Sequence, residues 1–444
     1  MDTKEFILEP AFNFASSESS VLLNEAQAKI GINGVTYIGD NQVRLDLLPR
    51  ASIHLYGKFH GVPATDILKL ATGQRSVSSF FINDREVEGF FLNIGGDIDA
   101  EELIIKWYPK SEPINVIGCD VTQMTRVVFH LFNFVELIGT RRSSERGKTI
   151  EHVDLSFDKW KVELKSFPET RDSLKTLIAE GGYSLTHVGC VEKVDCTTFS
   201  GKESYEQLNA LRAFFSFAKG VSCKPICAVG LDAFGERVWE SWSSPTEPWH
   251  QPPCWFEPHH SSQLMTLFQG FMRRWENDEW REALDEAIYW YLNANQSSRG
   301  IDAGIILTQA AIERLSYEFS VKYKRLFTVN AFKALWASDK FRLLFSSLGI
   351  PLDIPADTPE LRQLATNTEM NWIDAPHAVT EIRNSLVHPE HKRRSRLERA
   401  YYDGWKLGLW YLELAILAIC GYSGTYANRL KQRWTGQVEN VPWT

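Results

Sequence analysis

The sequence predicts an α+β protein in which a β-rich, sandwich-like N-terminal region precedes an all-α helical bundle. Up to about residue 260, short segments rich in β-branched and aromatic residues alternate with turn residues, as is typical of antiparallel sheets. From about residue 261, apolar residues recur at helical spacing in longer segments. We therefore expect a β-rich region over residues 1–260, either undivided or as two subdomains that meet near residues 150–180, and a helical domain over residues 261–444.

The expected strands are short and lie between turn residues. They are Val35–Ile38, Val43–Leu48, Ile53–Gly57, Phe90–Ile94, Leu103–Tyr108, Val127–Ile138 and Trp160–Lys165. Turns are expected at Asn33–Gly34, Gly39–Asn41 and Gly95–Asp97, where glycine and short polar residues cluster. One helix, Tyr205–Gly220, interrupts this region and ends at a glycine.

Six helices are expected in the second region. They are Gln263–Asn277, Asp278–Asn295, Asp302–Tyr323, Ala331–Ser347, Asp374–His388 and Arg396–Cys420. Three prolines between residues 349 and 359 predict a loop there. Apolar residues of the last helix recur at helical spacing, so one face of it should lie in the core of the bundle.

Composition narrows the class of protein. The 444-residue chain has a formal net charge of -8, so any contact with nucleic acid should be local. The apolar stretch Leu407–Cys420 contains Glu413 and is shorter than the roughly 20 residues of a membrane span. The first ten residues contain no apolar signal segment, and seven cysteines are typical of a reducing compartment. We therefore expect a cytoplasmic protein without a membrane partner.

One motif carries recognisable chemistry. Arg383, Asn384 and His388 form an R-N-x-x-x-H arrangement at the end of a predicted helix. Arginine presents a planar, permanently charged fork to phosphate oxygens, and histidine transfers protons near neutral pH. Together they can activate an RNA 2′-hydroxyl and stabilise the charged transition state without a metal or another cofactor. Asn384 can orient the pair or hold a phosphate.

The spacing of the motif constrains its geometry. Five residues place Arg383 and His388 about 140° apart around an ideal helix. Pro389 disfavours helical geometry at His388, which can then turn toward the arginine. A cleft shared by two copies of the helix would relax the constraint further.

On these residues, the region from Asp278 to Tyr422 resembles the HEPN superfamily. The resemblance implies a homodimer through the helical domain, a composite site, and metal-independent endoribonuclease activity that leaves 2′,3′-cyclic phosphate ends. It also implies a role in toxin or anti-phage abortive-infection systems. Arg383 and His388 would be the catalytic pair, with Asn384 beside them and Glu313 in support. The N-terminal region would then sense a phage-derived trigger or a regulatory partner protein.

A basic run follows the motif, and it has two interpretations. It consists of His391, Lys392, Arg393, Arg394 and Arg396. It either attracts RNA phosphates toward the site or forms an ordinary solvated loop and helix start.

Other interpretations stay open. Cys223, Cys227 and Cys254 could bind zinc with nearby histidines, although their spacing is unusual and small buried residues are the simpler interpretation. The helical domain could be a non-catalytic module that binds a nucleotide or a partner protein. Alternatively, a ligand-binding β-sandwich could carry the function, with the helices serving for dimerisation.

Overall fold

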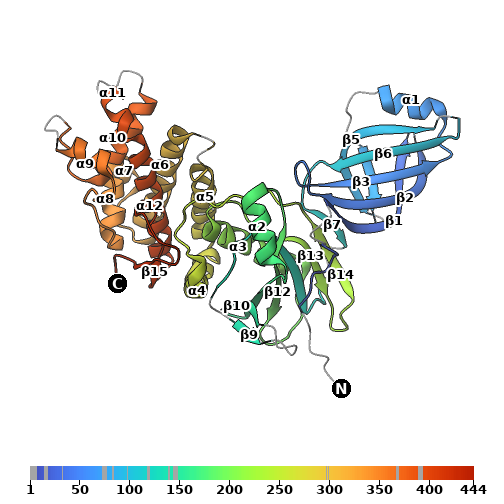
Figure 1. The fold of residues 1–444 in the computed structure, drawn as a ribbon, viewed down its shortest axis with the longest axis horizontal. Coiled ribbons are helices and arrows are strands. Elements are labelled where there is room, and N and C mark those ends of the chain that lie inside the picture. Colours follow the sequence, from blue (N-terminus) through green and yellow to red (C-terminus); the bar gives the residue numbers. More distant parts are fainter. Residues whose placement is uncertain are drawn as a thin grey trace.

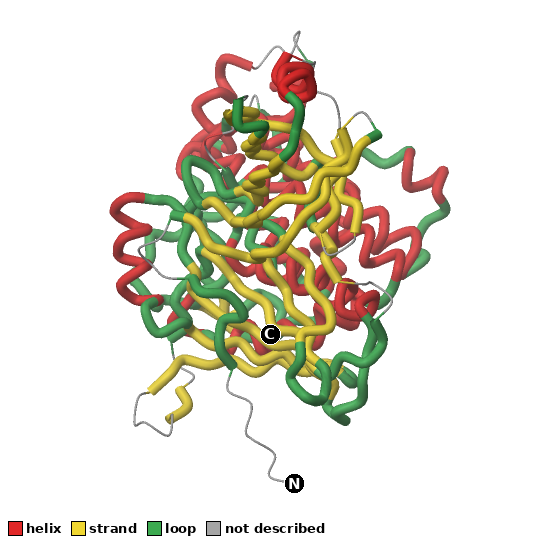
Figure 2. The backbone as a smooth tube through the Cα atoms, turned by 90° about the vertical axis from the view of Figure 1, so that its right-hand side faces the viewer, coloured by secondary structure: helices red, strands yellow, loops and turns green. Residues whose placement is uncertain are grey.

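The computed structural model describes residues 8–14, 19–32, 34–72, 78–82, 85–97, 99–117, 121–138, 141–143, 149–296, 298, 300–366, 370–388 and 394–444. Its parts follow one another along the long axis of the molecule: a β-barrel, a central sheet with helices, and a helical region (Figure 1). Seen from the barrel end, the strands lie in front and most helices lie behind them (Figure 2). The mixed α+β class predicted from the sequence is confirmed.

The N-terminal barrel is closed and antiparallel, in the order β1-β2-β3-β6-β5-β4. Its elements are β1 (Ser20–Ile32), β2 (Val35–Asp46), β3 (Ser52–His60), α1 (Ala64–Thr72), β4 (Ser78–Ile82), β5 (Arg85–Asp97) and β6 (Glu102–Pro109). Alternate residues point inward, so Val43, Leu45, Ile53, Leu55 and Phe59 are buried. The β-rich region is therefore built on a closed barrel rather than only on facing sheets.

Two turns expected inside this region are wrong. Gly39–Asn41 lies within β2 and Gly95–Asp97 lies within β5. A Cβ atom at Gly39 would lie 2.2 Å from the carbonyl oxygen of Lys58, and one at Gly96 would lie 1.9 Å from that of Glu102. These glycines therefore permit close approach of neighbouring strands. The expected turn at Asn33–Gly34 includes Asn33, which lies outside the described residues; Ile32 and Val35, on either side of it, pair with each other.

The central sheet has eight strands in the order β7-β14-β13-β8-β12-β11-β10-β9. They are β7 (Ile114–Ile117), β8 (Arg126–Phe132), β9 (Arg141–Ser143), β10 (Thr149–Phe157), β11 (Trp160–Ser166), β12 (Leu185–Lys193), β13 (Ile226–Leu231) and β14 (Arg237–Trp242). Helices α2 (Thr170–Glu180) and α3 (Gly201–Lys219) accompany it. The α3 helix starts four residues before the predicted one because Ser200 and Glu203 form a reciprocal capping box.

The N-terminal strap, residues 8–14, packs on one face of this sheet. Phe14 lies against His130 and Phe132, with ring centroids 4.6 and 5.5 Å away. Lys165 Nζ donates to the carbonyl oxygen of Leu8 at 3.1 Å. The opposite face of the sheet belongs to the large core that it shares with α3 and the helical region. Both faces of the sheet are thus covered.

The helical region contains the expected long helices with altered boundaries. Its elements are α4 (Ser262–Trp275), α5 (Asp278–Ala294), α6 (Ile301–Tyr317), a π-helical turn (Glu318–Tyr323), α7 (Val329–Lys333), α8 (Ala337–Leu348), α9 (Pro359–Ala365), α10 (Ala375–Val387), α11 (Arg394–Leu397), a 3-10 turn (Glu398–Ala400) and α12 (Tyr401–Ile419). The single helix expected over Ala331–Ser347 is in fact two, α7 and α8. In the described part of the chain, none of the helices is long and apolar enough to cross a membrane.

Candidate functional site

Helix α10 carries the predicted motif and is fixed at its start. Asp374 caps the helix by accepting from the backbone N–H of His377 at 2.9 Å. The same carboxylate receives two hydrogen bonds from the Arg342 guanidinium, at 2.6 and 3.0 Å. Farther along, the Ser385 hydroxyl lies 3.1 Å from that of Tyr401 in α12. These contacts hold α10 against α8 and α12, and therefore fix the backbone of the motif.

Arg383 is half-buried near the end of α10. Its Nη1 donates to Oδ1 of Asn384 at 3.3 Å, so the two predicted residues are in contact. Its Nε is buried and has no hydrogen-bond partner among the described residues. No described carboxylate forms an ion pair with it. A buried N–H without an acceptor costs roughly 1–3 kcal/mol of stability. This arginine is therefore suited to donate to a bound anion.

His388 lies immediately after the helix. Its backbone N–H donates to the carbonyl oxygen of Asn384 at 3.0 Å, while its φ of -109° and ψ of 103° are extended. The side chain is exposed. His388 therefore leaves the helical path, while Pro389, to which the sequence analysis attributes this, lies outside the described residues. The imidazole is accessible for proton transfer, next to the turn that carries Arg383.

Glu313 contacts residues outside the motif. This α6 residue accepts from Gln309 Nε2 at 3.0 Å, and its other oxygen lies 3.8 Å from Lys340 Nζ. It makes no described hydrogen bond or ion pair with Arg383 or His388. The supporting role of Glu313 therefore stays a prediction.

The basic run lies partly outside the described residues. His391, Lys392 and Arg393 lie outside the described residues, and for Arg394 the structure describes the backbone start of α11 but not the side chain. Arg396 is exposed on α11. Arg399, in the turn that follows, lies 3.7 Å from Glu360. Attraction of RNA and an ordinary solvated loop therefore both remain predictions for this run.

The three cysteines considered for zinc donate to separate backbone carbonyls. The Sγ atoms of Cys223, Cys227 and Cys254 lie 3.7, 3.4 and 3.2 Å from the carbonyl oxygens of Phe132, Ser243 and Ala218. Burial raises the pKa of Cys223 to about 11 and those of Cys227 and Cys254 to about 12. Zinc binds thiolates, which this environment disfavours. Among the described residues, no group of three histidines, cysteines or acids is arranged to hold a metal.

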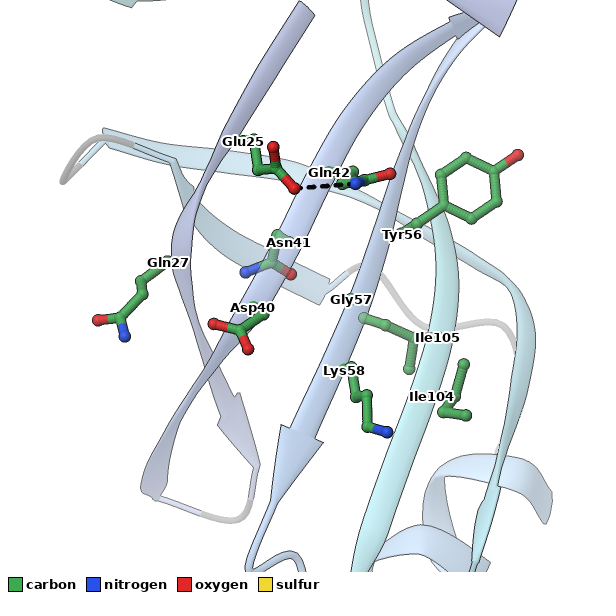
Figure 3. A pocket seen from close by; sticks show the side chains of 10 residues that line it. All are labelled: Glu25, Gln27, Asp40, Asn41, Gln42, Tyr56, Gly57, Lys58, Ile104 and Ile105. Carbon is green, nitrogen blue, oxygen red and sulfur yellow. Dashed lines mark hydrogen bonds between the residues drawn. The ribbon is translucent and has the colours of Figure 1, made fainter. Parts of the chain in front are cut away.

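A second candidate site lies on the barrel and escaped the sequence analysis. It is a groove of about 590 Å³ across β1, β2, β3 and β6. Figure 3 shows its lining residues: Glu25, Gln27, Asp40, Asn41, Gln42, Tyr56, Gly57, Lys58, Ile104 and Ile105. This volume is within the usual range for small-molecule sites. The signal for it in the sequence is the presence of polar residues at alternate positions, such as Glu25 and Gln27 or Asp40 and Gln42.

Hydrogen bonds order the polar wall of this groove. Gln42 Nε2 donates to Glu25 at 3.0 Å, as drawn in Figure 3. Arg44 Nη1 donates to Gln42 Oε1 at 3.0 Å, and Arg44 Nε donates to the Ser20 hydroxyl at 2.8 Å. Lys58 forms an ion pair with Glu102 at 2.8 Å. Glu25 and Asp40 leave the groove acidic, which disfavours a phosphate-rich ligand there.

Comparison with known proteins finds similarity in the two larger parts of the chain. Residues 120–252 match a family model described as the YopA central domain, and residues 277–440 match one described as the YopA C-terminal domain. The chain is also 28% identical over 425 residues to the SPbeta prophage-derived uncharacterized protein YopA of Bacillus subtilis (strain 168), covering 90% of each chain. No solved structure matches the chain.

These matches correct the family assigned from the motif. The region that resembled the HEPN superfamily, residues 278–422, lies inside the match to the YopA C-terminal domain. The assignment to the HEPN superfamily is therefore wrong. The physical reason is that the motif is short: an asparagine near a helix end and a histidine before a proline also occur where a helix simply terminates.

Proposed function

We propose that the helical region is an endoribonuclease in which Arg383 binds the scissile phosphate and His388 transfers the proton. The observation that carries the proposal is the state of Arg383, whose buried Nε has no acceptor in the described chain. Because this Nε is buried, a phosphate oxygen would reach it only after the side chain turns, and would then accept a charge-assisted hydrogen bond from it. Asn384 accepts a hydrogen bond from the guanidinium at 3.3 Å, which supports a role in holding it.

The chemistry follows from the two side chains. Neutral His388 removes the proton from an RNA 2′-hydroxyl, whose oxygen attacks the neighbouring phosphorus. The guanidinium of Arg383 stabilises the negative charge that develops on the phosphate oxygens. The proton then goes to the departing 5′-oxygen, and a 2′,3′-cyclic phosphate remains. The route uses these side chains alone, so it should proceed in EDTA.

The partners of the reaction are part of the same proposal. RNA would be the substrate and a second copy of the chain would complete the site, because Arg383 and His388 lie five residues apart on one helix end. All six described cysteines are free, which supports a reducing, cytoplasmic compartment. The matched Bacillus protein is prophage-derived, which supports a role in conflict with phage. Light scattering should then give twice the mass of the chain; a monomer at every concentration would exclude a shared site.

The acidic groove of the barrel supports a ligand-sensing role for the N-terminal region. Its acids and amides suit a neutral, hydroxyl-rich ligand or a cationic one, which would act as the trigger or regulatory partner. Isothermal titration of the wild type and of Asp40→Asn with candidate triggers tests this role. Loss of heat in the variant is expected, and equal heats would locate the sensing elsewhere.

RNA cleavage in EDTA tests the proposed nuclease. The variants Arg383→Ala and His388→Ala should each lose about 100-fold or more in rate, as expected for a lost proton donor or phosphate contact. Matched controls are the exposed Arg171→Ala and His60→Ala, which lie in the central part and the barrel and should cleave at the wild-type rate. Equal rates in all five proteins would contradict the proposal, because the activity would then come from another site.

A further inference from the structure

Three polar side chains on the outside of the barrel form a hydrogen-bonded series. The Ser52 hydroxyl lies 3.2 Å from Nε2 of His54. Nδ1 of the same imidazole lies 2.7 Å from Oδ2 of Asp46. The order of atoms is therefore hydroxyl, imidazole Nε2, imidazole Nδ1 and carboxylate. This is the order in which a serine nucleophile, its base and the orienting acid are arranged in serine hydrolases.

The register of two strands brings these residues together. Asp46 at the end of β2 pairs with Ser52 at the start of β3, and Arg44 pairs with His54. Side chains alternate along each strand, so Ser52, His54 and Tyr56 share the outer face while Ile53 and Leu55 fill the barrel. Regular strands therefore hold the series in place, which gives it the rigidity that a reacting site needs.

Asp46 is held in its ionised form. Burial alone would raise its pKa, but hydrogen bonds from His54, Tyr56, Ser20 and Lys106 outweigh burial and hold the pKa well below its usual range. The hydroxyl of Ser20 lies at 2.8 Å and Nζ of Lys106 at 3.1 Å from the carboxylate. An ionised carboxylate favours the imidazole tautomer with a proton on Nδ1. Nε2 of His54 then remains free to accept the proton of Ser52.

The series adjoins the groove on the same barrel. The Tyr56 hydroxyl donates to Asp46, and the Tyr56 side chain also lines the groove. Ser52 and His54 are half-buried, and the His54 side chain is 12% exposed. A substrate bound along the outer face of β3 would extend from the groove toward Ser52. The apolar side chain of Ile104, which is exposed in the groove, suits the hydrocarbon part of such a substrate.

We propose that Ser52, His54 and Asp46 form a second catalytic site, which hydrolyses acyl esters. Ser52 Oγ bonds to the carbonyl carbon of the ester while its proton passes to Nε2 of His54. The tetrahedral adduct then breaks its bond to the alcohol oxygen, which takes the proton from Nε2 and leaves as the alcohol. Water repeats the two steps, releasing the carboxylic acid and restoring Ser52. This activity is independent of Arg383 and His388.

Covalent labelling of the full-length chain with a fluorophosphonate probe tests the site. The probe phosphonylates activated serines and releases fluoride, so it reports on the nucleophile without knowledge of the substrate. We expect wild-type protein to be labelled, and Ser52→Ala and His54→Gln to lose labelling about 100-fold or more. The matched control is Ser79→Ala, which removes a half-buried hydroxyl from another strand of the barrel. It should be labelled like the wild type.

Two further readouts keep the result interpretable. Hydrolysis of p-nitrophenyl acetate should fall in the same variants, and thermal unfolding shows whether each variant is folded. If Ser52→Ala does not fold, mass spectrometry of the labelled wild type decides, because the adduct must then lie on Ser52. Absence of labelling in the wild type, an adduct on another serine, or full labelling of folded Ser52→Ala would each overturn the proposal.

Discussion

At the scale of single residues, His130 links the N-terminal strap to the central sheet. Its Nδ1 lies 3.3 and 3.1 Å from the carbonyl oxygens of Ile226 and Cys227, so it is the donor in both contacts. Its Nε2 accepts from the backbone N–H of Ala11 at 3.0 Å. Burial lowers the pKa of His130 to about 4, with a smaller contribution from Arg237. The neutral form is therefore built into the fold.

This histidine should make stability depend on pH. Between the unfolded pKa of 6.5 and the folded pKa of about 4, the unfolded chain binds a proton that the folded chain does not. Stability should therefore fall as pH falls through this range, by roughly 2–3 kcal/mol from His130 alone at pH 4.5. Urea unfolding at pH 7.5 and 4.5 checks this. His130→Gln should lose less stability than the wild type between these two pH values. His60→Gln, on the exposed surface of the barrel, should lose as much as the wild type.

Single residues also limited the sequence analysis of the site. The sequence identified Arg383, Asn384 and His388 as neighbours at a helix end, and the contact between Arg383 and Asn384 agrees with it. Glu313 was chosen because it lies on an earlier helix, but side-chain partners depend on packing that the sequence does not reveal. Ser52, His54 and Asp46 were missed because the strands Val43–Leu48 and Ile53–Gly57 were predicted without a register. Their side-chain contacts depend on the pairing of Asp46 with Ser52.

At the scale of elements, the long helices were predictable from the sequence. The short helices, and the pairing of strands that are distant in the sequence, were not. α4, α5, α10 and α12 follow from apolar residues at helical spacing, whose burial drives their packing. α1, α2 and α9 were missed because they are short, with few turns over which a period could be recognised. Barrel closure was missed as well, because it rests on the pairing of β1 with β4 and β3 with β6 across many residues.

The close contact between α4 and the end of α12 can be tested by the direction in which one substitution changes stability. A Cβ at Gly270 in α4 would lie 1.8 Å from the carbonyl oxygen of Cys420, just after α12. Helix propensity alone predicts that Gly270→Ala stabilises the protein by about 1 kcal/mol. The close contact predicts the opposite, a loss of about 1–3 kcal/mol as the helices separate. Thermal unfolding of Gly270→Ala decides between the two predictions. The control is Gly31→Ala in β1, where an added Cβ would have no contact within 4 Å.

At the scale of the whole molecule, a buried ion pair links α12 to the C-terminal segment and contacts the connector that leads from the central part to α4. The Arg429 guanidinium donates to both oxygens of Glu413, at 3.0 and 2.6 Å, and both side chains are almost fully buried. The same guanidinium donates to Asn295 Oδ1 at 3.0 Å and to the carbonyl oxygen of Pro253 at 2.6 Å. The connector before α4, helix α5, helix α12 and the C-terminal segment therefore share one polar centre.

Removing one partner of this pair should destabilise the whole molecule. Glu413→Gln leaves a buried guanidinium without its counter-charge, and we expect a loss of about 3–5 kcal/mol in the free energy of unfolding. Denaturant titration followed by tryptophan fluorescence measures it. Asp172→Asn provides the comparison, because it breaks an ion pair with Lys175 that is exposed to solvent, and its midpoint should match the wild type. A similar midpoint for Glu413→Gln would contradict the role of the pair.

The central claim is that this chain cleaves RNA by attack of a 2′-hydroxyl at the end of α10. The most direct measurement compares an RNA with a DNA of the same sequence, both in EDTA, and identifies the ends of the products by mass spectrometry. We expect only the RNA to be cut, with 2′,3′-cyclic phosphate ends, and the products to disappear in both Arg383→Ala and His388→Ala. Cleavage of the DNA, or RNA products with 5′-phosphate and 3′-hydroxyl ends, would contradict the claim.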